Sequence, residues 1–251
     1  MVERDSTQLL VVAPANWARF GHPLRMRHKE AEMKYGVLGT GMVGQAIARK
    51  LASMGHNVKM GSRTADNEKA KAFADEAGDN AGHGTFDDVA AFAETLFLCV
   101  QGAHVSAVLD AINDDHVAGK VLIDLTNPLD FSAGMPPFLS VAGNTSLGEQ
   151  LQARLPAANV VKTLNTVNCD LMVDPQSLPG AHDMFMCGND EVAKASVKSL
   201  LQDFGWKQVY DLGDIKASRG TESYLPLWLR LWGNLGTGTF NVHVVHNAEA
   251  Q

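Results

Sequence analysis

The chain has 251 residues, 45% hydrophobic and 20% charged, which is enough to bury a core in one or two domains. Its net charge of −7 argues against general nucleic-acid binding, which needs a basic face. No apolar run is long enough to cross a bilayer, and three scattered cysteines favour free thiols in a reducing compartment. We therefore expect a cytoplasmic protein that binds neither nucleic acid nor membrane.

The first 33 residues differ from the rest because they show no sustained hydrophobic period. Their apolar run "LLVVAPA" is too short and too weakly flanked to be a signal peptide. We expect residues 1–33 to form a flexible extension in front of the folded part.

From residue 34 onward, short apolar runs alternate with segments of helical spacing. The apolar runs predict strands at 34–39, 57–60, 95–100, 120–125, 159–164, 183–188 and 207–213. The intervening segments predict helices at 42–55, 66–78, 103–112, 146–155, 190–205 and 224–236. Such alternation builds a parallel sheet that is covered by helices on both faces.

The loop between the first strand and helix, "GTGMVG", fits the dinucleotide fingerprint through Gly39, Gly41 and Gly44. The first glycine permits a tight turn, the second lets a pyrophosphate approach the backbone, and the third lets helix and strand pack closely. The amides of the first helical turn then face the phosphates. The alternative is that these glycines only shape a turn. The predicted phosphate loop comprises Gly39, Thr40, Gly41, Met42, Val43 and Gly44.

The second strand ends in Ser62 and Arg63, where an NAD site places an acid that binds the ribose hydroxyls. A carboxylate there would repel a 2′-phosphate, whereas the guanidinium of Arg63 can pair with one. Ser62 can donate a further hydrogen bond. These residues predict NADP(H) rather than NAD(H), against the alternative of a solvated surface arginine.

At this point the chain resembles a known family. The segments "KYGVLGTGMVGQAIARKLASMGHNVKMGSR", "MFMCGNDEVAKASVKSLLQDFGW" and "DLGDIKASRGTESYLPLWLRL" are similar to the NADP oxidoreductases that use the deazaflavin coenzyme F420. The resemblance implies a Rossmann domain at 34–155 and a small C-terminal α/β domain at 156–251. It also implies hydride transfer between nicotinamide and deazaflavin in the cleft between them.

The resemblance assigns further positions. It implies that the phosphate loop and the pair Ser62 and Arg63 bind NADP(H), and that the turn after the 95–100 strand lies beside a ribose. That turn comprises Val100, Gln101 and Gly102. It also implies that "KTLNT" lies near the nicotinamide and the deazaflavin, where the best-known members carry histidine at the position of Asn165.

Two further turns carry amide and hydroxyl side chains after predicted strands. Asn165 and Thr166 follow the 159–164 strand, at the end where open α/β sheets bind ligands, and are our candidates for orienting a carboxamide or ring carbonyl. Asn127 follows the 120–125 strand, where a loop would pass the nicotinamide. The glycine- and proline-rich stretch after it suits a substrate lip. Turn capping and a plain connecting loop are the alternatives.

Other patterns favour structure over chemistry. Glu222 stands at a predicted helix start, where the helix dipole alone favours an acid. Trp228 and Trp232, four residues apart, indicate core or a homodimer interface more than a stacking platform. His243 and His246 have no acid or cysteine beside them in sequence, so we expect no metal site.

The sequence as a whole predicts an NADP(H)-dependent oxidoreductase that passes hydride to a small-molecule acceptor. The resemblance implies coenzyme F420 as the acceptor, and the same fold can serve FMN or FAD. Flavin-type acceptors need little acid–base help, so no catalytic dyad is expected. One alternative is an imino-acid reductase or 3-hydroxyacid dehydrogenase, although those enzymes usually add a long helical domain. The other is a non-catalytic NADP(H) sensor.

Overall fold

The computed structural model describes residues 32–247, so the extension expected at 1–33 lies outside the described residues apart from its last two positions. The strands are β1 (Lys34–Leu38), β2 (Asn57–Ser62), β3 (Ala81–Thr85), β4 (Thr95–Leu98), β5 (Val121–Asp124), β6 (Leu129–Asp130), β7 (Phe138–Leu139), β8 (Asn159–Thr163), β9 (Met184–Gly188) and β10 (Val209–Asp211). The α-helices are α1 (Met42–Ser53), α2 (Glu68–Ala77), α3 (Phe86–Phe92), α4 (Val105–Leu109), α5 (Leu147–Arg154), α6 (Cys169–Val173), α7 (Glu191–Phe204), α8 (Ser218–Ser223) and α9 (Leu225–Leu235). Short 3₁₀ helices are η1 (Gly78–Asn80), η2 (Gly102–His104), η3 (Asp114–His116), η4 (Pro175–Ser177) and η5 (Ile215–Ala217).

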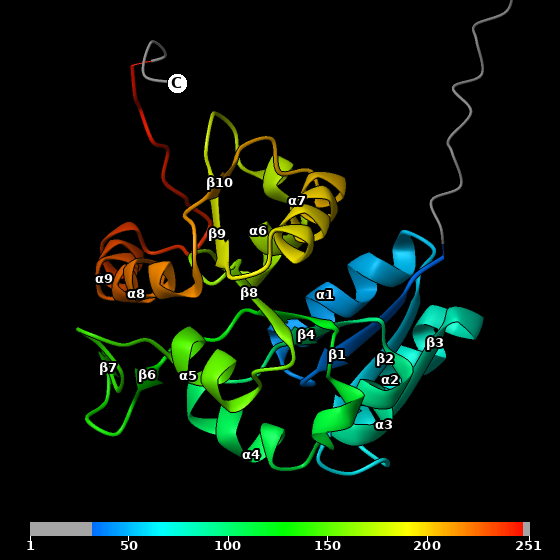
Figure 1. Ribbon diagram of the computed structural model, residues 1–251. Coiled ribbons are helices and arrows are strands. Elements are labelled where there is room, and N and C mark those ends of the chain that lie inside the picture. The colour runs from blue at the N-terminus through cyan, green and yellow to red at the C-terminus, as the bar shows by residue number, and fades with distance from the viewer. Residues whose placement is uncertain (1–31, 248–251) are drawn as a thin grey trace, which may run out of the picture. The chain divides into compact units, whose positions relative to one another are not determined.

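The main sheet has eight strands in the order β10-β9-β8-β5-β4-β1-β2-β3 (Figure 1). Neighbouring strands run parallel except β8 and β9, so β9 and β10 oppose the other six. The parallel part has the strand order of a doubly wound dinucleotide fold, which confirms the predicted Rossmann-type class. Because β8 pairs with β5, the sheet continues across residue 155. The division at that residue stays a prediction.

Helices cover both faces of the sheet because its strands are apolar on both sides. Val37 belongs to one buried cluster and its neighbour Leu38 to the other, as the alternation of a strand requires. The first cluster includes side chains of α1, α2, α6 and α7. The second includes side chains of α3, α4 and α5. Figure 1 shows α1 and α7 on one side and α4 and α5 on the other.

β3 and α3 have no counterpart among the predicted elements. The strand "AGHGT" contains two glycines and no apolar run, and it forms the edge of the sheet beside β2. Its last residue, Thr85, starts α3 through a capping box, in which the Thr85 hydroxyl accepts from the Asp88 amide and the Asp88 carboxylate accepts from the Thr85 amide. Local hydrogen bonds rather than hydrophobic period therefore define this pair.

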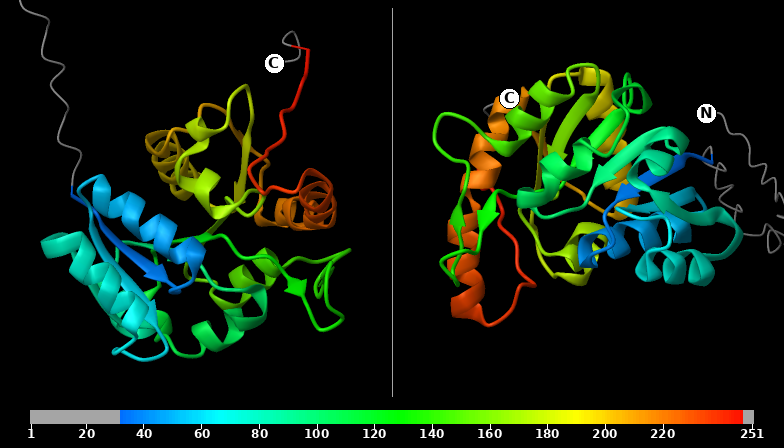
Figure 2. Two further views of the ribbon diagram at one scale, coloured as in Figure 1. Left: turned by 180° about the vertical axis from the view of Figure 1, so that it is seen from behind. Right: turned by 90° about the horizontal axis from the view of Figure 1, so that it is seen from below.

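The glycine- and proline-rich stretch after Asn127 contains the antiparallel hairpin β6–β7. Figure 1 shows this hairpin on the same side of the molecule as α8 and α9, below them in that view. Figure 2 shows it from two further sides. Phe131, Met135 and Phe138 are exposed in it. Its role as a substrate lip stays a prediction. Among the helices of residues 32–247, none is long and apolar enough to cross a membrane.

A buried ion cluster fastens the last part of the chain to the middle of the sheet. The ammonium of Lys162 on β8 lies 2.9 Å from a carboxylate oxygen of Asp124 on β5 and 2.9 Å from one of Glu222 on α8. All three side chains are almost fully withdrawn from solvent. Glu222 also accepts hydrogen bonds from the amides of Leu147 and Gly148, at 2.8 and 3.0 Å, in the first turn of α5. The cluster thus joins two strands and two helices.

The cluster keeps its lysine charged. Burial disfavours the ammonium, but the carboxylates of Asp124 and Glu222 outweigh that effect and raise the pKa of Lys162 above its ordinary value. Lys162 also donates to the carbonyl of Thr126 at 2.6 Å, and Asp124 accepts from the amide and hydroxyl of Thr126. The turn after β5 is therefore held by the same charges.

We expect Lys162→Met to lower the free energy of unfolding by about 3–5 kcal/mol, because it leaves two buried carboxylates without their cation. Urea denaturation of the two proteins measures the loss. Lys194→Met is the matched control. Lys194 is also buried, but its partners Glu191 and Asp211 are 81% and 34% exposed, so water can replace the lysine. Similar losses in both variants would contradict the role given to the cluster.

Candidate functional site

Every residue that the sequence predicted to bind the cofactor or acceptor lies at the end of a strand or shortly after it, at one edge of the sheet. The strands β2, β1, β4, β5 and β8 are mutually parallel, so their carboxyl ends meet along this edge. In strand order, the segments at these strand ends contain Ser62 and Arg63; Gly39, Thr40, Gly41, Met42, Val43 and Gly44; Val100, Gln101 and Gly102; Asn127; and Asn165 and Thr166. The topology thus gathers into one row residues that are scattered in the sequence.

The three glycines of the first turn have three different surroundings. Gly39 has φ +130°, and a Cβ there would meet the carbonyl oxygen of Cys99 at 2.4 Å. A Cβ on Gly44 would meet the carbonyl oxygen of Gly39 at 2.1 Å. Among residues 32–247, a Cβ on Gly41 would meet no atom within 4 Å apart from those of its own chain neighbours. The first and third glycines are therefore required by the fold, whereas the second keeps open space in front of the backbone.

The N-terminus of α1 is open toward that space. Gly41 is its N-cap residue, so no side chain caps the helix, and its first turn contains no acid. Met42 is 81% exposed. The amides of the first turn and the positive end of the helix dipole can therefore bind an anion.

Arg63 follows β2, the strand that pairs with β1. It is exposed, and among residues 32–247 it forms no hydrogen bond or ion pair. The nearby carboxylate of Asp66 accepts a hydrogen bond from the Thr64 side chain instead, and this bond lowers the pKa of Asp66. Ser62 is buried and its hydroxyl already donates to the carbonyl of Thr64. In this conformation Arg63, rather than Ser62, offers donors to a phosphate.

Backbone packing joins the first turn to those after β4 and β5. Gly39 lies against Cys99, and a Cβ on Gly102 would meet the carbonyl oxygen of Asn127 at 2.2 Å. Val100 also lies near Gly39, whereas Gln101 is exposed. Burial, together with Asp124, raises the pKa of the Cys99 thiol far above its ordinary value. This thiol stays protonated and is not a nucleophile.

The turns after β5 and β8 are joined by paired amides. Asn127 donates from Nδ2 to the backbone carbonyl of Asn165, and Asn165 donates from Nδ2 to Oδ1 of Asn127, both at 2.9 Å. Four buried side-chain atoms have no hydrogen-bond partner among the described residues: Asn165 Oδ1, Thr166 Oγ1, Tyr224 Oη and Trp228 Nε1. Two of these belong to the predicted acceptor-orienting pair. Native proteins leave few such atoms unpaired, and sites for ligands are one reason.

The environment that the sequence predicted for Glu222 was wrong. We expected an acid in the first turn of a helix, but Glu222 lies near the end of α8 and pairs with Lys162. Its neighbour Arg219 pairs with Glu149 on α5 and holds the pKa of that carboxyl at about 2. The signal for the cluster was present in "KVLIDL" and "NVVKTL", where Asp124 and Lys162 each interrupt an otherwise apolar strand.

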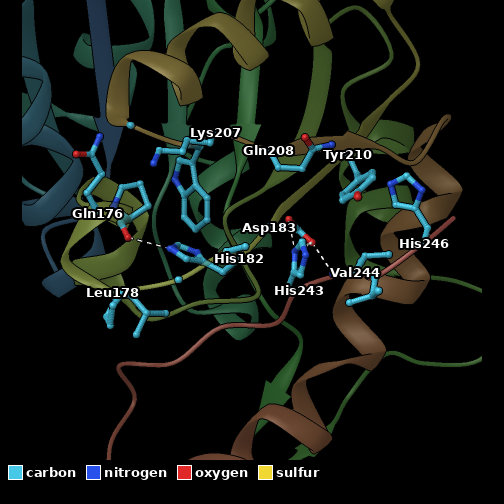
Figure 3. Close-up of a pocket in the computed structure, with 17 residues that line it drawn as sticks. Gln176, Leu178, His182, Asp183, Lys207, Gln208, Tyr210, His243, Val244 and His246 are labelled. Atoms are coloured by element: carbon cyan, nitrogen blue, oxygen red, sulfur yellow. Dashed lines mark hydrogen bonds and ion pairs between the residues drawn. The ribbon is translucent and has the colours of Figure 1, made fainter. Parts of the chain in front are cut away.

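A pocket of about 680 Å³ lies elsewhere, beside the starts of β9 and β10, and contains none of the predicted site residues (Figure 3). Asp183 in this pocket accepts from the Val244 amide and lies 3.1 Å from the ring of His243. No acid stands directly beside "HVVH" in the sequence, but Asp183, which directly precedes β9, lies beside His243 in the structure. Within residues 32–247 no three metal-binding side chains gather.

The tryptophan stripe of α9 is partly covered. The ring of Trp228 lies 5.9 Å from that of Trp232 and stacks on Phe240 at 5.2 Å. Trp232 remains 39% exposed, and Leu227 and Leu235 are more than half exposed. The aromatic stripe of α9 is therefore partly packed against Phe240 and partly exposed to solvent.

One family model and several known proteins are similar to this chain. The family model for "NADP oxidoreductase coenzyme F420-dependent" matches residues 34–128. The chain is 27% identical over 218 residues to the F420-dependent NADP reductase of Methanocaldococcus jannaschii, a match covering 82% of this chain and 96% of that protein. It is 29% identical over 206 residues to Metalloreductase STEAP3 of Rattus norvegicus, covering 80% of this chain and 38% of the metalloreductase. This chain therefore spans well under half the length of the rat protein.

Solved structures show the same relationship. A proposed F420-dependent NADP-reductase from Arthrobacter sp. FB24 superposes with a TM-score of 0.81 and 46% identity, over 85% of this chain and 100% of the other. A reductive aminase from Aspergillus terreus in complex with NADPH has a TM-score of 0.58 and 22% identity, over 81% of this chain and 62% of the other, which is a likeness of fold alone. Because this chain is 46% identical to the Arthrobacter protein over that protein's full length, it belongs to the family of coenzyme F420-dependent NADP oxidoreductases.

Proposed function

We propose that this chain is an oxidoreductase that binds NADP(H) along the carboxyl edge of its sheet and exchanges a hydride with a deazaflavin of the F420 type or with a flavin. One observation carries the cofactor assignment. The exposed guanidinium of Arg63 has no partner among the described residues and follows β2, the strand beside the open N-terminus of α1. A dinucleotide with an extra phosphate on its adenosine ribose uses both features.

The residues present fit such a cofactor. The pyrophosphate would occupy the space that Gly41 keeps open, held by the amides of Met42, Val43 and Gly44. Arg63 would hold the 2′-phosphate. The turns of Val100 to Gly102 and of Asn127 continue the edge toward Asn165 and Thr166. The phosphate end of the site is thus charged, whereas its far end is neutral and buried.

Bound NADPH supplies a hydride at its nicotinamide ring, so the protein has to align two rings and exclude water. Asn165 and Thr166 are the groups at this edge that can orient a ring, because each has an unused polar atom. The F420-dependent reductase of Methanocaldococcus jannaschii, which this chain spans almost completely, supports the deazaflavin as acceptor. The similarity to a metalloreductase makes a ferric chelate an informative competitor.

An acceptor panel tests this function. Purified protein should oxidise NADPH when coenzyme F420, FMN or FAD is added, and should oxidise NADH much more slowly. Absorbance at the reduced-nicotinamide band measures the rate, with ferric citrate as the metal acceptor. Tight NADPH binding without turnover on any of these acceptors would instead favour a non-catalytic sensor.

We expect Arg63→Ala to weaken NADPH by about 1–3 kcal/mol, which is about 5- to 150-fold in Kd, because it removes a charged hydrogen bond to the 2′-phosphate. NADH lacks that phosphate, so its Kd should not change. Isothermal titration calorimetry gives both constants. Arg49→Ala is the control, since Arg49 is an exposed arginine already paired with Glu76. Equal losses for NADPH and NADH would remove Arg63 from the site.

Gly41→Val should abolish dinucleotide binding, because the added side chain fills the pyrophosphate space. The protein should still fold, because in the described part of the chain a Cβ at this position meets no atom within 4 Å beyond its chain neighbours. Gly44→Ala is the matched comparison. Its Cβ would strike the Gly39 carbonyl, so it should lower the melting temperature as well. Unchanged NADP⁺ affinity in Gly41→Val would show that the dinucleotide binds elsewhere.

We also propose that the chain forms a homodimer through α9. The exposed side chains of Leu227, Trp232 and Leu235 lie on one helix, and burying such a patch favours association. A cytoplasmic location, consistent with three free cysteines, stays a prediction.

A further inference from the structure

The loop between β2 and α2 carries Arg63 on the surface of the protein. Residues 63–66 of this loop are all exposed, so an unrestrained chain here would sample many conformations. Binding a phosphate through such a loop costs conformational entropy, unless the loop is already held in place before the ligand arrives. The groups that hold the loop therefore affect how well Arg63 can bind an anion.

Short-range hydrogen bonds shape the loop from within. The Ser62 hydroxyl donates to the Thr64 carbonyl, and the Thr64 side chain donates to the Asp66 carboxylate. The side chain of Asn67 then accepts from two amides in the first turn of α2, which caps that helix. These bonds join residues two or three positions apart, so they fold the loop on itself without attaching it to a neighbouring strand.

A histidine of the edge strand β3 makes such an attachment. His83 lies 18 positions after Ala65, and its Nδ1 atom is 2.9 Å from the backbone carbonyl oxygen of that residue. Because β3 runs parallel to β2 and places His83 opposite Met60, the ring reaches past the end of β2 to the loop. A carbonyl oxygen can only accept, so Nδ1 carries the hydrogen of this bond.

This contact lies at one end of the carboxyl edge of the sheet. Figures 1 and 2 show the β2–β3 end of the sheet, coloured blue to cyan, on the opposite side of the molecule from α9. Three strands, β1, β4 and β5, separate β2 from β8. A change at His83 should therefore affect what binds beside Arg63 and leave the far end of the edge as it is.

We propose that His83 is a positioning residue for the 2′-phosphate of the dinucleotide, because it holds the Ala65 carbonyl and with it the loop that carries Arg63. This inference rests on the proposed function, which places the 2′-phosphate at Arg63. His83 acts before the cofactor arrives, so it raises affinity by lowering the entropy cost of binding and does not touch the phosphate. The role needs an N–H donor at the position of Nδ1, and it needs no charge.

The first test compares two cofactors that differ only in the 2′-phosphate. His83→Ala should bind NADP⁺ about 2- to 10-fold more weakly, the range expected for one lost hydrogen bond, and should bind NAD⁺ as before. His83→Asn should restore most of the affinity, because the Nδ2 group of asparagine can donate from the position of Nδ1. Equal losses for both cofactors, or no recovery in His83→Asn, would overturn the proposal.

His116→Ala is the matched control for this comparison. His116 also bonds one partner through Nδ1, the carboxylate of Asp87 at 2.8 Å. It precedes β5, however, so it lies at the opposite edge of the sheet from the loop. Its loss should leave the Kd of both cofactors unchanged.

A second test separates holding the loop from contacting the phosphate. A residue that acts through Arg63 has nothing to position once Arg63 is gone, so adding His83→Ala to Arg63→Ala should not weaken NADP⁺ any further. An additional loss of affinity in the double variant would show that His83 binds the phosphate itself, and the positioning role would be wrong.

Hydrogen–deuterium exchange of the ligand-free protein gives a readout that needs no cofactor. Amides of residues 64–67 should exchange faster in His83→Ala and at the original rate in His83→Asn, while those of β1 keep their rate in both. Unchanged exchange in the loop of His83→Ala would refute the proposal. A failure of the proposed function looks different, because the unmodified protein would then bind NADP⁺ no better than NAD⁺ even though the loop exchanged as described.

Discussion

A lysine withdrawn from solvent between two carboxylates determines how the last part of this chain meets the sheet. Lys162, Asp124 and Glu222 come from β8, β5 and α8, and the amides at the start of α5 complete the cluster. Buried ion pairs add little net stability compared with apolar packing, but an arrangement that leaves one member unpaired is strongly disfavoured. The cluster therefore specifies which elements meet, and through Thr126 it fixes the turn that carries Asn127.

In the function that we propose, the carboxyl edge of the sheet combines two kinds of recognition. At the β1 and β2 end, an open helix N-terminus and an exposed arginine suit phosphate groups, which stay partly solvated. At the β8 end, buried neutral atoms suit a flat ring that displaces water. This division matches what a hydride carrier needs, because its charged part provides affinity and its ring must be aligned within a fraction of an ångström.

The sequence predicted the apolar strands and the glycine turn after β1 well for local reasons. Each of its apolar strands is continuous in sequence, and the glycine spacing is set by contacts within one turn, so Gly39, Gly41 and Gly44 have the surroundings expected of them. The strand β3 was missed because "AGHGT" has no apolar period. Glu222 was misplaced because its partner Lys162 is far away in sequence, and no local pattern shows that a helix end will be buried against a strand.

The sequence by itself determined the α/β class, the glycine turn after β1 and the arginine after β2, because these depend on neighbours a few residues apart. Only the tertiary structure decided that Ser62 bonds to its own turn and that Asn127 and Asn165 pair. It also decided that oxygen atoms of Asn165 and Thr166 find no partner among residues 32–247. The physical reason is that hydrogen-bond satisfaction inside a protein is a property of all groups that surround an atom. Those groups come from strands whose order the sequence does not state.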